Sequence, residues 1–341
     1  MPVSFKDANT SLGVGVIGLG IGEVHARAIL DDERCRLEVV CDQNPDRLSQ
    51  VADSFQDTRT TTSPLEVIND PAVLLVCIAT FDDSHASLVV KALDHGKDVF
   101  VEKPLCISTE ELKDIQGAIQ RNPGCRVSSN LILRRAPRFI ELKRRIDRGD
   151  LGHLYFIQGA YDYGRLHKIT SGWRAAANNY SVMSGGGIHL IDLALWLSGQ
   201  KVTNVVAFGN NISTRDSAFI GMDLVAATAQ LTDGSVLQIT ANFGSVTPHH
   251  HLLRVYGTDG SFEQSHGSAG YMFSRDRQDA PEILTDNYPR VDKSALFLEF
   301  VSEILGQVPP SIPLHDTLHA MAVSLAVDES VRTGNSVIPI A

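Results

Sequence analysis

The strongest constraint on the fold is a series of short apolar runs that alternate with helix-like segments through the first 130 residues. Apolar runs of this kind are typical of strands that are buried on both faces of a parallel sheet. They occupy 12–18, 37–42, 73–80 and 98–104. The segment 84–96 is amphipathic and closes with a glycine, as a helix often does. The alternation predicts an α/β domain with a doubly wound parallel sheet at 1–130.

The pattern changes after this first region. A helix-like stretch opens the second part of the chain, and two more come late, at 294–305 and 315–333. Between them lie stretches with the alternating pattern of strands, at 154–164, 202–211, 219–244 and 251–265. Two Asp-Gly pairs, at 233–234 and 259–260, are strong hairpin signals. We expect 131–341 to form a second, α+β domain with a large, mostly antiparallel open sheet.

Composition and charge exclude several classes of partner. The net charge is −10, and the densest basic residues, Arg134-Arg135 and Lys143–Arg145, fit the solvated side of a helix better than a phosphate-binding patch. No apolar run approaches the ~20 residues of a membrane span, and the first residues lack the apolar core of a secretory signal. The cysteines number five, and two of them, Cys41 and Cys77, lie inside apolar runs. We therefore expect free thiols in a cytoplasmic protein without nucleic-acid or membrane partners.

The glycines that end the first apolar run suit the binding of a dinucleotide. Gly18, Gly20 and Gly22 lie in GLGIGE, where a buried strand would turn into a helix. Such a turn needs glycine for positive φ and for close approach of the backbone to a pyrophosphate, and the helix N-terminus adds N–H donors. The spacing is GxGxG, because Glu23 takes the place of the usual third glycine. Glycines that merely form a turn are the alternative.

Asp42 ends the second apolar run, 20 residues after Gly22. A carboxylate at this place accepts hydrogen bonds from both ribose hydroxyls and repels a 2′-phosphate. Gln43 and Asn44 follow it and bring no cation for that phosphate, so the sequence favours NAD over NADP. An aspartate that only caps a helix is the alternative.

Two further motifs carry residues that could move a proton. Lys103, in Glu102-Lys103-Pro104, would stand at the carboxyl end of a strand, where ligands bind in open α/β sheets; a surface lysine is the alternative. His189 and Asp192, in SGGGIHLID, are three residues apart on one predicted helix and would share a face. A carboxylate there could orient the imidazole, and the glycines would let a substrate approach. These features favour a general acid–base role for His189 over a histidine buried in the core.

These motifs, in this order, resemble those of the glucose–fructose oxidoreductase, inositol dehydrogenase and rhizopine-catabolism family (Gfo/Idh/MocA). Thr80 and His85, followed by HGKDVFVEKPL, are similar to the most specific block of that family, and VYGTDGSFE resembles its late strand pair. The resemblance implies that Lys103 contacts the substrate hydroxyl and the nicotinamide ribose, that His189 accepts the proton, and that Asp192 is the acid beside it. It implies a cofactor site formed by Gly18, Gly20, Ile21, Gly22, Asp42, Gln43, Thr80, His85, Glu102 and Lys103.

Two departures from the family pattern leave the substrate open. Many family members place an aspartate four residues before the histidine, and that position is Gly185 here. The Pro-Asn that follows the family's threonine is replaced by Phe81-Asp82. Aromatic and polar side chains ahead of the glycines suit a polyhydroxylated ring, and arginines could pair with a carboxylate or phosphate. With Lys103 and His189, the candidate substrate-binding residues are Tyr161, Arg165, His167, Trp173 and Arg174. A surface loop with ordinary charges is the alternative for this segment.

The three consecutive histidines at 249–251 do not predict a metal site. Adjacent residues of a strand point to opposite faces, so the three imidazoles cannot bind one ion from regular β geometry. We expect no metal, and we interpret one of the three as facing the substrate.

Taken together, these features predict NAD-dependent oxidation of a secondary hydroxyl of a sugar, sugar acid, nucleotide sugar or cyclitol, with Lys103 and His189 handling the proton. Gly185 keeps two alternatives open: an NAD-binding regulator or redox sensor that has lost catalysis, and an enzyme that uses tightly bound NAD transiently. The resemblance also implies a homodimer or homotetramer formed through the open sheet of the second domain.

Overall fold

The computed structural model describes residues 11–55, 57–177, 180–266, 269–275, 280–286, 288 and 292–340. The chain forms two compact units. The first runs to Asn130 and includes Asp292–Leu314, and the second holds Leu131–Val291 and the chain from His315 onward. We expected 292–314 in the second domain. It belongs to the first because Phe297 and Phe300, on a helix in this segment, pack on Phe100 with ring centroids 5.2 and 6.0 Å apart.

The first unit is built on a six-stranded parallel sheet in the order β3-β2-β1-β4-β5-β6, which is the Rossmann order. Its strands are β1 (Leu12–Ile17), β2 (Cys35–Cys41), β3 (Arg59–Thr61), β4 (Leu75–Ile78), β5 (Asp98–Val101) and β6 (Val127–Ser129). Every residue of β1 and β4 is buried, because helices cover both faces of the sheet. The predicted doubly wound parallel sheet is confirmed.

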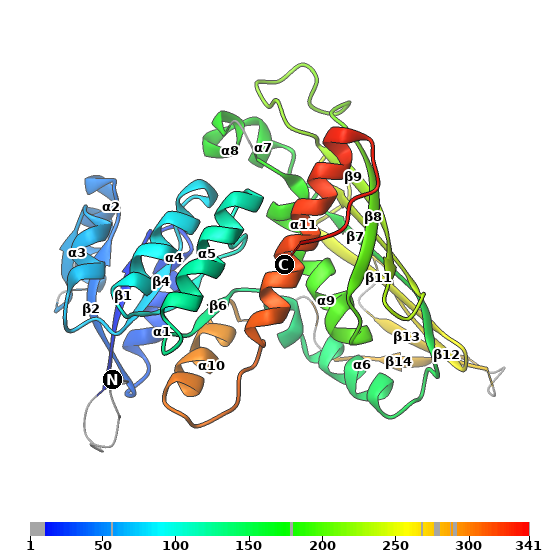
Figure 1. The fold of residues 1–341 in the computed structure, drawn as a ribbon, viewed down its shortest axis with the longest axis horizontal. Helices are drawn as coiled ribbons and strands as arrows, with labels where there is room; N and C mark the ends of the chain where they lie inside the picture. The colour runs from blue at the N-terminus through cyan, green and yellow to red at the C-terminus, as the bar shows by residue number, and fades with distance from the viewer. Residues whose placement is uncertain are drawn as a thin grey trace. The chain divides into compact units, whose positions relative to one another are not determined.

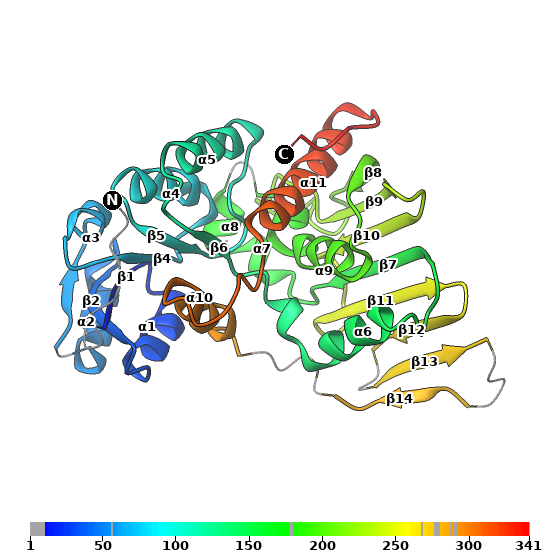
Figure 2. The ribbon, with the colours of Figure 1, turned by 60° about the horizontal axis from the view of Figure 1, so that its bottom comes forward.

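Helices lie on both sides of this sheet (Figure 2). One face carries α1 (Gly22–Leu30) and α10 (Ala295–Ile304), and the other carries α3 (Pro64–Asn69), α4 (His85–Asp94) and α5 (Thr109–Arg121). The helix α5 begins where it does because the Ser108 side chain accepts a hydrogen bond from the Glu111 N–H at 3.1 Å. The remaining helical elements of this unit are α2 (Pro45–Val51) and short turns at Ala52–Ser54 and Asp82–Ser84.

The second unit is built on an eight-stranded sheet in the order β14-β13-β12-β11-β7-β10-β9-β8. Its strands are β7 (Leu154–Asp162), β8 (Val202–Asn210), β9 (Leu224–Leu231), β10 (Val236–Asn242), β11 (His250–Gly257), β12 (Gly260–Gln264), β13 (Gly270–Ser274) and β14 (Glu282–Leu284). Neighbouring strands are antiparallel except for β7 and β10, so the predicted mostly antiparallel sheet is confirmed.

One face of this second sheet is covered by α6 (Pro137–Asp147), α9 (Ile188–Ser198) and α11 (Leu314–Thr333) (Figure 1). The strands alternate accordingly: Val225, Ala227 and Ala229 of β9 are buried, whereas the residues between them are exposed. The opposite face exposes large apolar side chains, with Phe208 72% exposed. Shorter helical elements are Ile132–Arg135, α7 (His167–Thr170), α8 (Gly172–Ala176) and a π-helical turn at Met183–Gly187. None of the helices in the described ranges is long and apolar enough to cross a bilayer.

Candidate active site

The glycine turn joins β1 to α1 at the carboxyl end of the parallel sheet. Gly18 has a φ of +90°, and a Cβ there would lie 2.5 Å from the carbonyl oxygen of Ala79, so only glycine fits. Gly22 packs α1 against the sheet, because a Cβ would come within 3.1 Å of the side chains of Val16 and Ala79. Beside Gly20, in contrast, no atom of the described residues other than Gly20 and its two chain neighbours lies within 4 Å of the Cβ position. That open space lets a pyrophosphate approach the backbone, so the turn fits the phosphates of a dinucleotide.

The carboxylate of Asp42 is held against this turn. Its Oδ2 accepts a hydrogen bond from the Leu19 N–H at 2.8 Å, and its Oδ1 accepts one from the Asn44 N–H at 2.9 Å. A carboxylate oxygen has two lone pairs, so both oxygens can still accept hydrogen bonds from ribose hydroxyls. Gln43, the neighbour of Asp42, is exposed. The residues present therefore fit the adenosine ribose of NAD.

Arg47 is a residue of this site that the sequence did not reveal. Its Nη2 and Nε donate hydrogen bonds to the carbonyl oxygen of Leu19 at 2.9 and 3.0 Å, and it forms an ion pair with Glu23. Hydrogen bonds from Arg27, together with the nearby Arg47, lower the pKa of Glu23. Glu23, an acid in the place of the usual third glycine, is the sequence feature from which a nearby cation could have been predicted. Arg47 thus braces the turn from the side of β2.

The parallel register brings the ends of β1, β4 and β5 to one level. Ile17 pairs with Ile78, and Ile78 pairs with Val101. The residues that follow these strands therefore lie side by side at the carboxyl edge. This places Thr80 and Lys103 beside the glycine turn, at the edge where ligands bind in this fold.

Glu102 turns its carboxylate toward the interior of the first unit. Its Oε1 lies 2.9 Å from Nε2 of His25 and accepts a hydrogen bond from Nδ2 of Asn130 at 2.8 Å. Burial pushes the pKa of Glu102 upward, but the hydrogen bonds from His25 and Asn130 and the charge of Lys103 hold it below its ordinary value. We expected Glu102 to line the cofactor site. These contacts make Glu102 an anchor for Lys103, the residue that follows it.

His85 joins the two loops that leave β4 and β5. Its imidazole is almost fully buried, with Nδ1 2.7 Å from the carbonyl oxygen of Pro104 and Nε2 3.2 Å from that of Thr80. Both ring nitrogens of His85 thus face backbone carbonyl oxygens, which can only accept hydrogen bonds. The side chain of Thr80 is itself held by the Ser84 hydroxyl at 2.7 Å. His85 therefore fixes the loop of Lys103 from behind.

In the second unit, the glycine-rich segment forms a π-helical turn, Met183–Gly187, that continues directly into α9. Turns of this kind are rare and are frequent at functional sites. Here the glycines make room for neighbouring side chains. A Cβ on Gly186 would lie 2.6 Å from the ring of Tyr161, and one on Gly185 would lie 2.2 Å from the hydroxyl of Tyr180. The missing side chains thus allow rings to pack on the helix.

His189 belongs to an aromatic cluster that covers this turn. The cluster consists of Tyr161, Tyr163, Tyr180, His189, Phe243, His249 and His251. Tyr161 is its centre, with ring centroids 6.5 Å from His189, 5.2 Å from His249 and 5.0 Å from His251. Burial raises the pKa of Tyr161, so its hydroxyl stays neutral. His189 is itself only 9% exposed.

The three consecutive histidines divide between the faces of the sheet. His249 and His251 contact Tyr161, whereas His250 packs on His266. Burial lowers the pKa of His249 to about 4 and that of His251 to about 3, so both imidazoles are neutral at pH 7. Within the described ranges, no group of three potential metal-ligating side chains comes together.

Asp192 is fully buried on α9 and binds Arg134. Both carboxylate oxygens accept hydrogen bonds from this guanidinium, with Nη2 to Oδ1 at 2.5 Å and Nε to Oδ2 at 2.9 Å. A further bond joins Arg134 to Asp316 at 3.0 Å. The interpretation of Arg134 as a solvated surface residue was wrong, because it is 3% exposed. We expected the Asp192 carboxylate to orient His189. In the structure it instead forms the ion pair with Arg134.

The structure brings most of the substrate candidates of the second unit together. The guanidinium of Arg174 lies 4.5 Å from the ring of Trp173 and 5.5 Å from that of Tyr180. Arg165 lies 5.5 Å above the ring of Tyr163. All of these adjoin the aromatic cluster that includes Tyr161. His167 is instead exposed at the first residue of α7.

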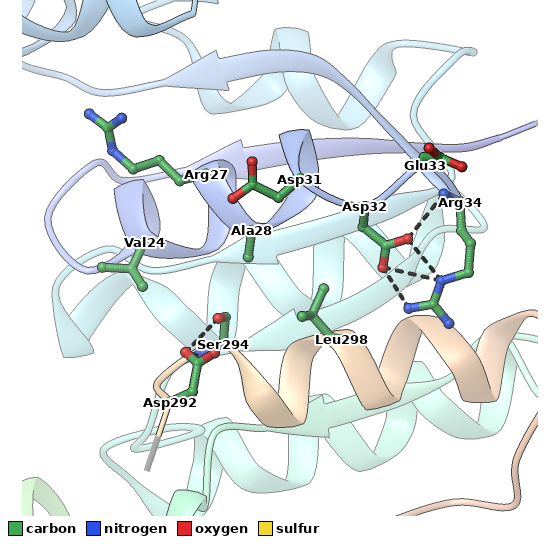
Figure 3. A pocket seen from close by; sticks show the side chains of 10 residues that line it. All are labelled: Val24, Arg27, Ala28, Asp31, Asp32, Glu33, Arg34, Asp292, Ser294 and Leu298. Carbon is green, nitrogen blue, oxygen red and sulfur yellow. Dashed lines mark hydrogen bonds and ion pairs between the residues drawn. The ribbon is translucent and has the colours of Figure 1, made fainter. Parts of the chain in front are cut away.

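A separate hollow of about 590 Å³ lies in the first unit, along α1 and α10 (Figure 3). It extends to Asp32 and Arg34, between the end of α1 and the start of β2, and thus toward the amino edge of the sheet. The carboxylate of Asp32 pairs with the guanidinium of Arg34 at 2.5 Å. Among the described residues that line the hollow, none is a glycine of the turn between β1 and α1.

Comparisons with known proteins agree with this architecture. Residues 12–131 match the sequence model of an oxidoreductase family with an NAD-binding Rossmann fold, and residues 139–263 match the GFO/IDH/MocA C-terminal domain. The chain is 29% identical over 254 residues to the scyllo-inositol 2-dehydrogenase (NAD(+)) of Bacillus subtilis strain 168, covering 72% of this chain and 71% of that one.

Two solved structures share the fold over nearly the whole chain. A levoglucosan dehydrogenase in complex with NADH has a TM-score of 0.85 at 20% identity, covering 97% of this chain and 100% of that one. A scyllo-inositol dehydrogenase from Lactobacillus casei with bound NAD(H) and scyllo-inositol has a TM-score of 0.78 at 20% identity, with the same coverage. Both domain types of one family therefore occur here in the expected order. This chain belongs to the GFO/IDH/MocA family and is an NAD-binding oxidoreductase.

Proposed function

We propose that the protein is an NAD-dependent dehydrogenase that oxidises a secondary hydroxyl of a cyclitol or sugar, the broader class including sugar acids and nucleotide sugars. The observation that carries the proposal is the combination of a dinucleotide turn with a buried histidine inside a cluster of neutral aromatic groups. Polyhydroxylated rings are bound by such mixtures of aromatic and polar side chains. The names of the related proteins point to the same substrates.

The glycine turn and Asp42 would hold the cofactor. Backbone N–H groups at Gly20 and Ile21 would face the pyrophosphate, and Asp42 would bind the ribose hydroxyls. When bound, NAD supplies the acceptor for the hydride that leaves the substrate carbon. The carboxylate of Asp42 also disfavours the 2′-phosphate of NADP, because it would be repelled at short distance. We therefore propose a preference for NAD.

His189 and Lys103 would handle the proton. His189 accepts the proton of the substrate hydroxyl, and Lys103 donates a hydrogen bond to the hydroxyl oxygen and stabilises the charge that develops there. Lys103 is well suited to this role because its loop is held by Glu102 and by the His85 bridge. A fixed lysine loses little orientational freedom when substrate binds.

The test measures NAD reduction with scyllo-inositol, levoglucosan and related polyols as probes. Lys103→Met and His189→Gln should each lower kcat/KM by about 100-fold or more, since general acid–base groups contribute on this order. NAD binding, followed by protein fluorescence quenching, should persist in His189→Gln. A Lys103→Met variant with full turnover would contradict the mechanism. Tight NADH binding without turnover on any polyol would favour a regulator or redox sensor, and co-purified cofactor without net NADH release would favour transient use of NAD.

We also propose that the protein assembles as a homodimer or homotetramer through the open face of the eight-stranded sheet. Exposed apolar side chains lie at both edges of this face: Val206 and Phe208 on β8, and Phe273 and Ile283 on β13 and β14. Exposed apolar patches on a sheet are typical of protein interfaces. Sedimentation analysis of Phe208→Lys should show dissociation toward monomer. The five free thiols fit a place in the reducing cytoplasm.

A further inference from the structure

A small cavity of about 260 Å³ lies in the second unit, where the end of α9 meets the start of α11. The helix α9 lies between α6 and α11 (Figures 1 and 2). All three contribute to the lining: Lys143 of α6, the end of α9 with the residues up to Lys201, and His315, Asp316 and His319 of α11. None of the described residues that line the cavity belongs to the aromatic cluster around Tyr161. The cavity is therefore separate from the candidate substrate site.

His319 offers a hydrogen-bond donor at the wall of this cavity. Its Nε2 accepts a hydrogen bond from the Val202 N–H at 3.1 Å. A backbone N–H can only donate, so Nε2 carries the lone pair and the proton of the neutral imidazole is on Nδ1. Burial and the charge of Lys201 lower the pKa of His319, so the ring stays neutral at pH 7. Within the described ranges, no residue accepts a hydrogen bond from Nδ1, and this donor is available to a ligand.

The acceptor atoms at the cavity wall already have donors. The side-chain oxygen of Gln200 accepts a hydrogen bond from the Thr232 hydroxyl at 2.6 Å. Asp316 is the one carboxylate among the described residues of the lining. Its Oδ2 accepts a hydrogen bond from Nη1 of Arg134 at 3.0 Å, and its Oδ1 lies 3.1 Å from Nε2 of His315. The negative charge of Asp316 is therefore met by neighbouring groups before any ligand binds.

The donors at the wall, in contrast, are largely unused. Among the residues that the structure describes, none accepts a hydrogen bond from the ammonium of Lys201. The ammonium of Lys143 donates one bond, to Asp147 at 2.6 Å, and keeps two further hydrogens. The amide N–H groups of Gln200 and Nδ1 of His319 add donors from the chain just after α9 and from α11. Donors that converge from several sides suit the oxygens of a tetrahedral oxyanion, and lysine ammonium groups commonly bind phosphate.

The wall of the cavity is fixed before a ligand binds. The guanidinium of Arg134 is buried, binds Asp316 and holds Asp192 in an ion pair. It also lies 6.0 Å from the ring of Trp196, which lines the cavity. A preformed site loses less conformational freedom on binding than a mobile one. Trp196 and Leu195 give the cavity an apolar side, which suits the carbon skeleton of an organic ligand.

We propose that this cavity binds a phosphate group, either free or carried by a small metabolite. The ammonium groups of Lys201 and Lys143 balance its charge, while His319 and Gln200 donate hydrogen bonds to its oxygens. The volume of about 260 Å³ lies below the ~300–1,000 Å³ of typical ligand pockets, so a small ligand fits and a dinucleotide does not. The site is distinct from the glycine turn of the first unit. Its occupancy does not depend on the proposed dehydrogenase reaction.

Isothermal titration calorimetry tests the proposal on the whole chain saturated with NADH, which keeps the probes away from the glycine turn. The probes are inorganic phosphate and glycerol 3-phosphate, each titrated at constant ionic strength. Lys201→Met should weaken binding about tenfold, because it removes a charge-assisted hydrogen bond, and Lys143→Met should weaken it by a smaller factor. The exposed Lys113→Met on α5 is the matched control and should bind as the parent does. Tighter binding of glycerol 3-phosphate would assign the site to a phosphorylated metabolite, and tighter binding of inorganic phosphate would assign it to the free ion.

A second measurement locates the bound probe. In ¹⁵N spectra of histidine-labelled protein, the Nδ1 signal of His319 is assigned by its loss in His319→Asn. It should shift with the same concentration dependence as the heat of binding. Arg174→Met, at the aromatic cluster, should leave both measurements unchanged. Binding that Lys201→Met leaves intact, or that Arg174→Met abolishes, would place the phosphate elsewhere and overturn the proposal, as would the absence of saturable binding of both probes.

Discussion

The two units use glycine-rich helix starts for opposite purposes. At the start of α1, the Cβ side of Gly20 faces open space within 4 Å, so the backbone is accessible to a ligand. At the start of α9, the spaces beside Gly185 and Gly186 are filled by the rings of Tyr180 and Tyr161. The segment at the start of α1 has small residues so that a cofactor can approach its backbone. The segment before α9 has small residues so that aromatic side chains can surround a histidine. A run of glycines in the sequence does not by itself distinguish these two uses.

The helix N-termini differ in the same way. Among the residues that the structure describes, no side chain caps α1 at its N-cap residue Ile21, so the first N–H groups of the helix can face an anion. The helix that leads into α9 is capped from within the protein: the Ser181 hydroxyl accepts hydrogen bonds from the N–H groups of Met183 and Ser184, each at 3.1 Å. It donates one to Asp328 at 2.8 Å. The start of α1 therefore suits an anion better than the start of the helix that leads into α9.

The largest expected effect tests whether the buried charges of the second unit are structural. Arg134→Met should lower the free energy of unfolding by about 3–5 kcal/mol, because it leaves the buried carboxylate of Asp192 unpaired. The double variant Arg134→Met/Asp192→Leu should recover most of that loss. Chemical denaturation measures both. If Asp192→Asn instead folds normally but changes the His189 tautomer, Asp192 would act on the histidine, as the sequence suggested.

The next largest effect is a pH dependence of stability. It arises from Asp328, which binds Ser181 at the start of the helix that leads into α9. Burial raises the pKa of Asp328 to about 6, although hydrogen bonds from Ser181 and Ser184 oppose the shift. The folded protein therefore holds a proton that the unfolded chain has released above about pH 4. The stability that this group contributes is complete below pH 4 and is lost as pH rises through 6, by ~3 kcal/mol.

Asp328→Asn removes this titration. The difference in unfolding free energy between the parent and the variant, measured from pH 4.5 to 8, should grow in favour of the variant as pH rises. The exposed Asp147→Asn on α6 provides the matched control and should give a difference that is flat over this range. A difference that does not change with pH for Asp328→Asn would mean that burial does not raise the pKa of the Asp328 carboxyl.

The sequence predicted the fold well where elements are long and periodic. The runs at 12–18 and 98–104 became β1 and β5, and 315–333 became α11 within one residue. It missed β3 and β6, because three-residue strands carry too few positions for a pattern. The packing of 292–314 with the first unit was also missed. It depends on rings that are about 200 residues apart in the chain, Phe100 and Phe297.

Candidate site residues could be proposed from the sequence where they lie in one motif, whereas contacts with remote partners could not. Local motifs led to Lys103, His189 and Asp42 as candidates, and their roles are proposals. The burial of Arg134 was not predicted, because its partner Asp192 is 58 residues away and the adjacent Arg135 made the segment look like a basic surface. Tyr180 lies in no motif at all. Only the structure shows that its ring packs against Gly185 of the turn before α9.

The comparison of the two glycine segments can be tested by adding one methyl group to each. Gly186→Ala should lower the free energy of unfolding by about 2 kcal/mol, because a Cβ would lie 2.6 Å from the Tyr161 ring. Gly20→Ala should leave stability within about 0.5 kcal/mol but weaken NAD binding, since the methyl group enters the space for the pyrophosphate. Thermal unfolding and NAD titration of both variants measure the contrast. Equal destabilisation by the two alanine substitutions would contradict the proposed difference between the two glycine segments.

The smallest effect concerns the choice of cofactor at the open turn. Asp42→Ala removes the carboxylate that would bind the ribose and repel a 2′-phosphate, so NAD should bind about tenfold more weakly, which corresponds to about 1.4 kcal/mol. NADP should bind more tightly than in the parent, because Arg47 already lies beside the turn and can release Glu23 to pair with a phosphate. The double variant Asp42→Ala/Arg47→Met should lose this gain. If NADP binds equally well to the parent and to Asp42→Ala, the acid does not select the cofactor and the ribose is oriented by other groups.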